Sequence, residues 1–255
     1  MPDAANGYSS ASQSARVLSE LWASRWLYCM NCGNEPLTKF ENNKPVADLY
    51  CAHCGNEYEL KSQKVKFGRT IANGAYSKKI ERLQSNSSPN LVLLHYSSRD
   101  RRVLNLTAIP RRFFIPSIIH RRAPLRAGAR RAGWVGSNIL LHLIPTIGRV
   151  PIVKDGAVVR KEVVLDQWQQ TAFLDALPKD RKGWLIDVMS CVDRIDAETF
   201  CLDDVYQFED HLSRLYPNNN NVRPKIRQQL QVLREQGFLE FLGKGLYRKV
   251  KSTSR

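Results

Sequence analysis

The sequence predicts an α/β (α+β) domain with a mixed sheet and an inserted four-cysteine metal site, followed by a smaller helical domain that ends in a β-hairpin. Three observations predict this class. Two Cys-x2-Cys pairs lie near the start, strand-like and helix-like apolar segments alternate through the middle, and amphipathic helices precede a glycine-tipped hairpin at the end. The 255 residues, 43% of them hydrophobic, are enough for one medium core and a small second one.

The first segment, residues 1–13, is small and polar, and we expect a flexible tail there. Ser14 is then predicted to cap a helix that runs to Leu27. Val17, Leu21 and other apolar residues recur at helical spacing along it, so one side of this helix faces a core.

Two cysteine pairs follow the helix: Cys29, Cys32, Cys51 and Cys54. Four thiolates in two Cys-x2-Cys turns can close a tetrahedron around Zn2+, and a glycine after each pair lets backbone N–H groups point at the sulfurs. Two disulfides or four unrelated cysteines are the alternatives. The chain shows no signal peptide, so we expect a reducing, cytoplasmic setting of bacterial type. The spacing therefore predicts structural zinc, with His53 as a bystander.

The second cysteine pair lies in a predicted hairpin that carries acidic residues. Side chains alternate along a strand, so Glu59 and Lys61 share one face. A turn between His53 and Cys54 places Asp48 opposite Glu59. Two carboxylates and a lysine then converge on one spot.

Carboxylates this close repel each other unless a cation lies between them, and hard oxygen ligands suit Mg2+. Asp48, Glu59 and the Leu60 carbonyl would ligate the ion, which activates a water, while Lys61 offsets the charge that develops on a phosphate. A solvated hairpin with an ordinary Glu/Lys pair has the same spacing, so these residues alone leave both interpretations open.

Helix-like and strand-like segments alternate after the hairpin. We expect a helix over residues 75–83 and strands over 91–96, 103–109, 137–144 and 150–153. This alternation predicts a mixed sheet, and we find no internal repeat.

Turn-forming and charged residues around 176–183 predict a boundary between a domain of residues 14–180 and one of residues 181–255. The second domain is predicted to hold helices over 184–192, 202–215 and 222–236, then a hairpin over 238–249. Gly237 ends the third helix.

Three helices before a basic hairpin are the outline of a winged helix, whose last helix enters the major groove of DNA. The outward face of that helix carries Arg223, Arg227 and Gln228, and the hairpin tip carries Lys244. A small helical dimerisation domain is the alternative. The clustered basic and amide side chains favour DNA binding.

The charge supports a polyanionic partner. The chain has 39 Lys+Arg against 24 Asp+Glu, a net charge of +15, and its pI is near 9.8. Arginine pairs recur between Arg99 and Arg131, where lysine is absent, and the guanidinium fork suits phosphate and guanine edges. No transmembrane-length apolar run or lipidation signal points to a membrane.

Taken together, these residues resemble the DpnI-like methyl-directed (type IIM) restriction endonucleases of the PD-(D/E)XK superfamily. The resemblance covers nearly the whole chain, from about Ser14 to Lys249. Its densest blocks are residues 41–48, 59–62, 129–136 and 225–234. Val46-Ala47 precedes Asp48 where the superfamily pattern has Pro, but the aspartate itself is kept.

The resemblance implies a PD-(D/E)XK catalytic core with inserted zinc, followed by a winged helix. It implies an enzyme that cuts both strands of double-stranded DNA at GATC sites whose adenine carries an N6-methyl group, with Mg2+ at Asp48, Glu59 and Lys61. We expect a monomer that reads the methylated site through both domains. The expected DNA contacts are Arg130, Arg131, Trp134, Arg223, Lys225, Arg227, Gln228 and Lys244.

Trp134 lies between two glycines just after Arg130-Arg131. A tryptophan is more often buried in a core, but the resemblance favours a role in holding the methyl group. Two other functions stay open: a non-catalytic zinc-ribbon/winged-helix regulator, which does not need the acidic residues, and a nuclease of the same superfamily with different sequence specificity.

Overall fold

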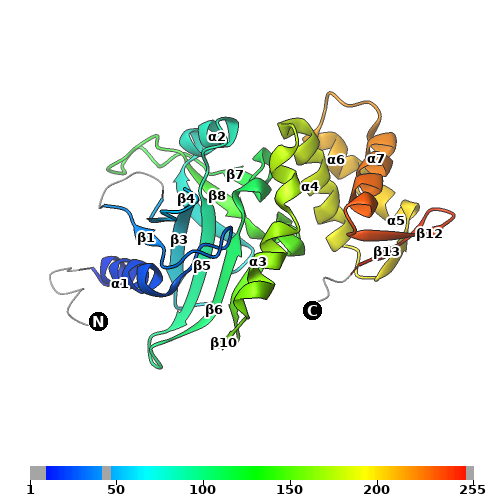
Figure 1. The fold of residues 1–255 in the computed structure, drawn as a ribbon. Coiled ribbons are helices and arrows are strands. Elements are labelled where there is room, and N and C mark those ends of the chain that lie inside the picture. The colour runs from blue at the N-terminus through cyan, green and yellow to red at the C-terminus, as the bar shows by residue number, and fades with distance from the viewer. Residues whose placement is uncertain (1–9, 42–46, 251–255) are drawn as a thin grey trace.

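The computed structural model describes residues 10–41 and 47–250 (Figure 1). Residues 42–46 belong to the first block of the family resemblance, residues 41–48, and they include Val46. They lie outside the described residues. Helix α1 (Ala11–Trp26) begins before the predicted start, with Ser10 and not Ser14 at the N-cap. Ser14 lies inside the helix and its hydroxyl donates to the Ser10 carbonyl, so the predicted tail is wrong for residues 11–13.

A mixed seven-stranded sheet forms the centre of the larger part of the molecule. Its strands, in spatial order, are β1 (Thr38–Lys39), β2 (Leu49–Tyr50), β3 (Glu57–Gln63), β5 (Asn90–Ser97), β6 (Arg102–Ile109), β9 (Val150–Lys154) and β10 (Ala157–Val158). Only β3 and β5 are parallel within it; the other neighbours are antiparallel. The predicted mixed sheet is confirmed.

A second, antiparallel sheet has the order β4 (Thr70–Ala75), β8 (Gly136–Leu140) and β7 (Ile119–Arg121). The predicted strand over 137–144 is therefore shorter, because the chain continues as a 3-10 helix, η4 (Leu141–Leu143). This turn buries Leu141 and Ile144 together. The described residues also form the 3-10 helices η2 (Arg111–Phe113), η3 (Pro116–Ile118), η5 (Thr146–Gly148) and η6 (Ala172–Ala176).

Strand β5 separates two apolar clusters because its side chains alternate between faces. Val92 and Leu94 join α1 and α3 (Lys161–Gln169) on one face. Leu91 and Leu93 join the other cluster, which extends through α4 (Lys179–Asp193) into the C-terminal helices. Helix α2 (Tyr76–Gln84) lies near β4 (Figure 1).

The C-terminal part contains α5 (Leu202–Tyr206), α6 (Glu209–Leu215) and α7 (Val222–Glu235), with a small sheet of order β11 (Thr199–Cys201), β13 (Leu246–Lys249) and β12 (Leu239–Gly243). The helix predicted over 202–215 is in fact two helices. The break at Gln207 and Phe208 lets Phe208 pack against the core and under the Arg194 guanidinium.

The end of α7 is as predicted, because Gly237 adopts a left-handed φ of 75° that a side chain disfavours. Helix α4 begins at Lys179, before the start predicted for the second domain, and Trp184 is buried within it. Across the described residues, no helix is both long and apolar enough to cross a membrane.

Candidate nuclease site and DNA-binding surfaces

The four cysteines of the two turns meet at one point. Their sulfur atoms all lie within 4.8 Å of one another, and the closest pairs are Cys29–Cys54 at 3.5 Å and Cys32–Cys51 at 3.6 Å. A zinc tetrahedron with Zn–S bonds of about 2.3 Å places its sulfurs about 3.8 Å apart. All four cysteines are free, which argues against the disulfide alternative. The donor set therefore fits Zn2+.

The two turns have the same backbone hydrogen bonds. Gly33 N–H donates to the Cys29 carbonyl and Gly55 N–H to the Cys51 carbonyl, both with left-handed φ. Burial acts to raise the pKa of Cys54, but hydrogen bonds from Asn56, together with those to Cys29 and Cys32, outweigh it and lower the pKa to about 6. A thiolate is the form that binds metal.

Helix α3 covers the first cysteine turn, a contact that the sequence did not predict. The Gln169 amide donates to the Asn31 carbonyl at 2.8 Å, and Leu165 lies against Gly33, where an added Cβ would come within 3.2 Å of it. Tyr58, at the start of β3, is fully buried, and its hydroxyl lies 3.1 Å from the Cys29 sulfur. The four-cysteine site and strand β3 are thus connected through the Tyr58 side chain.

The hairpin of β2 and β3 has the predicted register. Leu49 pairs with Tyr58 and Tyr50 with Glu57, as a turn between His53 and Cys54 requires. Just before β2, Asp48 lies beside the next part of β3: its N–H donates to the Tyr58 carbonyl, and its carboxylate accepts from Leu60 N–H at 2.7 Å. The structure therefore brings Asp48 next to the strand that carries Glu59 and Lys61.

Burial raises the pKa of Asp48, and the hydrogen bond from Leu60 N–H works against that rise. The N–H and C=O of one strand residue point to the same side, so the Leu60 carbonyl is directed toward Asp48 as well. On the same strand the Lys61 ammonium lies 2.7 Å from a Glu59 carboxylate oxygen. Two partly buried carboxylates and a carbonyl thus lie on neighbouring parts of the hairpin, and the charge of Glu59 acts on Asp48. Carboxylate and carbonyl oxygens are the ligands that suit a hard divalent cation.

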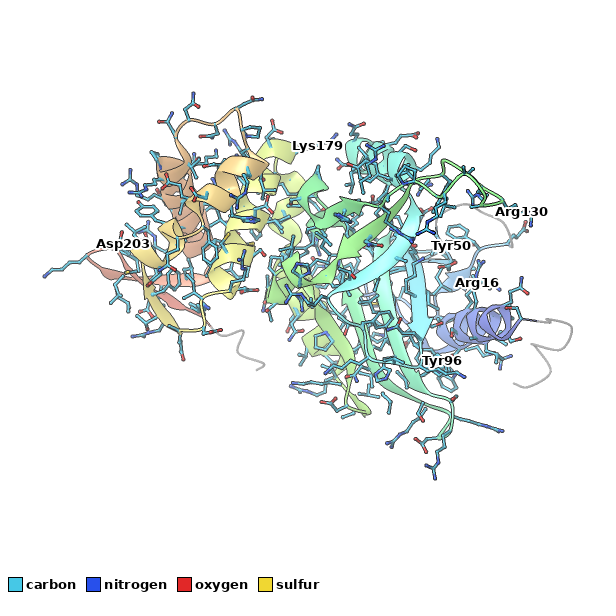
Figure 2. All side chains as sticks on the ribbon, turned by 180° about the vertical axis from the view of Figure 1, so that it is seen from behind. Arg16, Tyr50, Tyr96, Arg130, Lys179 and Asp203 are labelled. Atoms are coloured by element: carbon cyan, nitrogen blue, oxygen red, sulfur yellow. The ribbon has the colours of Figure 1, made fainter. Side chains whose placement is uncertain are left out.

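Helix α1 adds a third carboxylate that the sequence interpretation missed. Glu20 is 4% exposed and pairs with Arg16 at 2.5 Å and with Lys39 at 3.0 Å. Arg16 also reaches Asp48, at 3.6 Å, and Figure 2 shows it on α1. A signal for Glu20 was available, because it precedes the buried Ala23 by one helical turn and so faces the core.

Helix α2 supplies a second missed residue, Lys79. Its side chain is 7% exposed, with the ammonium 4.7 Å from the centre of the Phe114 ring. Burial lowers the pKa of Lys79, while the charge of Glu59 raises it and that of Lys61 lowers it further. Lys79 is therefore part of the electrostatic environment of the acidic site. The apolar spacing of Ile80 and Leu83 on this helix gave no indication of this role.

Trp134 lies on a projecting loop, and it is half-buried instead of lying in the core. Leu125 N–H donates to the Trp134 carbonyl, which closes the loop. The indole lies over Gly136, where an added Cβ would come within 2.8 Å of it, and the Arg131 guanidinium lies 4.8 Å from the ring centre. Arg130 is exposed on this loop (Figure 2). Arginine and aromatic side chains therefore gather on one accessible segment.

The outer face of α7 carries the other predicted DNA contacts. Arg227 and Gln228 are exposed. Lys225 donates to the Gln228 side chain at 2.8 Å. Arg223 is already engaged, because it pairs with Glu209 at 2.7 Å and lies over the Tyr206 ring.

The tip of the hairpin completes this surface. Lys244 is exposed in the turn between β12 and β13, with a left-handed φ of 48°. Figure 2 marks this end of the molecule by Asp203, far from Arg16 and Arg130. Basic side chains therefore face solvent at both ends of the molecule.

Comparison with protein families gives two matches that together span most of the chain. Residues 3–177 match the model described as the Dam-replacing family, DpnI. Residues 180–249 match the model described as the Dam-replacing HTH domain. The second match agrees with a DNA-binding role for the helices around α7.

Proposed function

Because the chain belongs to the Dam-replacing family of DpnI-type, methyl-directed restriction endonucleases, we propose that it hydrolyses both strands of double-stranded DNA at GATC sites with N6-methyladenine, with Mg2+ as the catalytic ion. The observation that carries the proposal is the convergence of Asp48, Glu59 and Lys61 on the β2–β3 hairpin. A DNA-binding regulator would have no use for that arrangement.

We assign Asp48, Glu59 and the Leu60 carbonyl as the groups that would hold Mg2+, as in the PD-(D/E)XK pattern. A divalent ion here supplies Lewis acidity to the scissile phosphate and lowers the pKa of a bound water. The protein's own part is to hold the ligands in place. Leu60 N–H fixes the Asp48 carboxylate, and Arg16 offsets its charge in the free enzyme.

Lys61 is the residue we assign to the attacking water and the phosphate. Its ammonium can donate to a phosphate oxygen as negative charge builds up, and can orient the water in line with the leaving oxygen. In the reaction the water oxygen bonds to phosphorus and the bond from phosphorus to one deoxyribose oxygen breaks. One proton of the attacking water passes to solvent, and the leaving deoxyribose oxygen takes up a proton from solvent to become a hydroxyl. Lys79, buried beside Glu59 and Lys61, adds positive potential to the same place.

Two surfaces are assigned to DNA. Arg227 and Gln228 on α7 suit guanine and adenine edges in the major groove, while Lys244 suits a backbone phosphate. On the catalytic part, Arg130 and Arg131 suit phosphates, and Trp134 offers an apolar face to the methyl group. Zn2+ at the four cysteines has a structural role, because no ligand position stays open for chemistry.

One experiment separates the candidate functions. The purified protein is incubated with Mg2+ and with plasmid from adenine-methylating or non-methylating cells, and the products are mapped. We expect double-strand cuts at GATC in the methylated plasmid alone. Cuts elsewhere would indicate a related nuclease of different specificity, and salt-sensitive binding without any cleavage would indicate a regulator.

A further inference from the structure

A cavity of about 580 Å3 lies between the part of the molecule that carries the acidic site and the C-terminal helices. Its walls come from the end of α2, from the segment around η2 and η3, from α4, and from the end of α6 with Tyr216. None of Asp48, Glu59 and Lys61 lines it. The volume is within the range of about 300–1,000 Å3 that is typical of small-molecule sites.

The charge of the cavity favours an anion. Six basic residues line it against three acidic ones, and two of the acids are already engaged. Asp175 accepts from Arg112 at 2.6 Å. Asp187 accepts from the Ser117 hydroxyl at 2.8 Å and from the Tyr216 hydroxyl at 2.6 Å. The positive groups therefore dominate the field inside.

Two buried polar atoms on the wall lack a hydrogen-bond partner among the described residues. They are the Ser88 hydroxyl and the Nε of Arg112, in side chains that are 5% and 4% exposed. Lys182, on α4, is 9% exposed, and it lies within range of the charge of Asp175 and of three basic residues, Arg111, Arg112 and Lys179. An ammonium and a guanidinium N–H can only donate. Unmet buried donors are costly, which makes an acceptor-rich ligand favourable.

The remaining wall is apolar, formed in part by Phe114, Ile115 and Leu215. We propose that this cavity binds a phosphate-bearing molecule of mononucleotide size, with its phosphate at Lys182, Ser88 and Arg112 and its apolar part against Phe114. Burial lowers the pKa of Lys182, and a bound anion would raise it again by stabilising the charged form.

The test uses the full-length protein and deoxyadenosine 5′-monophosphate or inorganic phosphate as probes in isothermal titration calorimetry. We expect the nucleotide to bind more tightly than phosphate, because only the nucleotide covers the apolar wall. Lys182→Met should weaken nucleotide binding by about tenfold or more, since it removes a charged hydrogen bond. Ser88→Ala removes a hydroxyl without a protein partner, so it should weaken binding while it leaves folding intact.

The matched control is Lys78→Met, which removes the same charge from α2 at a position paired with Glu81 outside the cavity. It should bind as the unaltered protein does. Nucleotide displaced by duplex DNA would identify a DNA phosphate as the natural occupant, and undisturbed binding would identify a free nucleotide. Absence of binding by both probes at millimolar concentration, or equal affinity in all variants, would overturn the proposal.

Discussion

At the scale of single residues, we expect that substitutions in the acidic site reduce DNA cleavage without reducing DNA binding. Lys61→Ala should lower the cleavage rate by at least about 100-fold, the cost of removing one donor to a developing oxyanion. Asp48→Ala should abolish cleavage, because it removes a ligand for Mg2+. Binding to methylated DNA, measured without cleavage in Ca2+, should stay nearly unchanged. The control Lys66→Ala removes an exposed lysine from the same region, and full activity in Lys61→Ala would mean that the active site lies elsewhere.

Trp134 is accessible on its loop, which makes the methyl contact testable. One methyl group buried against the indole is worth about 0.8 kcal/mol, or about fourfold in affinity. Trp134→Ala should therefore narrow the difference in cleavage between methylated and unmethylated plasmid, without removing it, because we expect α7 to read the site as well. Trp26→Ala, at a tryptophan that is 66% exposed on α1, is the control. Unchanged discrimination in Trp134→Ala would place the methyl pocket elsewhere.

The residues that sequence reasoning located and missed differ for a physical reason. Asp48, Glu59 and Lys61 lie on one hairpin, so strand alternation and one turn position were enough to predict their approach. Glu20 and Lys79 come from helices that pack from outside the hairpin. Their contribution depends on how those helices dock, which periodicity does not encode.

At the scale of elements, the four-cysteine site supports the strand that carries the acids. Cys51→Ser should lower the folded yield and the activity together, because metal binding supplies folding free energy and Tyr58 connects the site to β3. Circular dichroism measures the folded fraction, plasmid cleavage measures the activity, and metal analysis measures the zinc content. Cys201→Ser is the control, since Cys201 caps α5 and serine is a good cap. Active protein that contains no zinc would contradict the structural role.

Helix α7 and the hairpin tip should contribute to DNA binding in different ways. Arg227→Ala or Gln228→Ala should relax sequence preference by about 1–3 kcal/mol, because a bidentate base contact is lost. Lys244→Ala should weaken binding to all sequences alike. It should also reduce the slope of the logarithm of the binding constant against the logarithm of the salt concentration by about one, because one phosphate contact is lost. Binding curves at several salt concentrations, on GATC and scrambled duplexes, distinguish the two. The same response from every variant would mean that α7 does not read bases.

Elements with a clear period were predicted well, and short or unusual ones were not. Strands β5 and β6 and helix α7 have long regular patterns. Strand β4 contains Asn73-Gly74 with a register shift, and α3 gains its place by packing on the cysteine turn. Tertiary contacts determine the conformation of β4 and the position of α3, so local propensity alone could not predict these elements.

At the scale of the whole molecule, Asp187 joins the two parts, because it accepts hydrogen bonds from Ser117 and Tyr216. Burial raises its pKa from 3.8 to about 6. The stability it contributes is therefore fully present below pH 4 and is lost as the pH rises through about 6. That loss corresponds to about 3 kcal/mol in the free energy of unfolding.

Asp187→Asn should remove this part of the pH dependence. Chemical denaturation between pH 4 and pH 8 measures the slope, and the exposed Asp203→Asn serves as the control. An identical pH dependence in the unaltered protein and Asp187→Asn would show that the carboxyl group is charged throughout.

One apolar cluster runs from β5 through α4 into the C-terminal helices. The C-terminal helices are therefore joined to the rest of the described molecule by a packed interface and not by a linker alone. Two binding units joined by a flexible linker can contact one ligand in many relative orientations. The effective concentration of the second unit then depends on linker length. Packed units permit only the geometries that their shared interface allows. The shared interface therefore fixes the distance between the surface on α7 and the loop of Trp134. A duplex that contacts both surfaces has to match that distance.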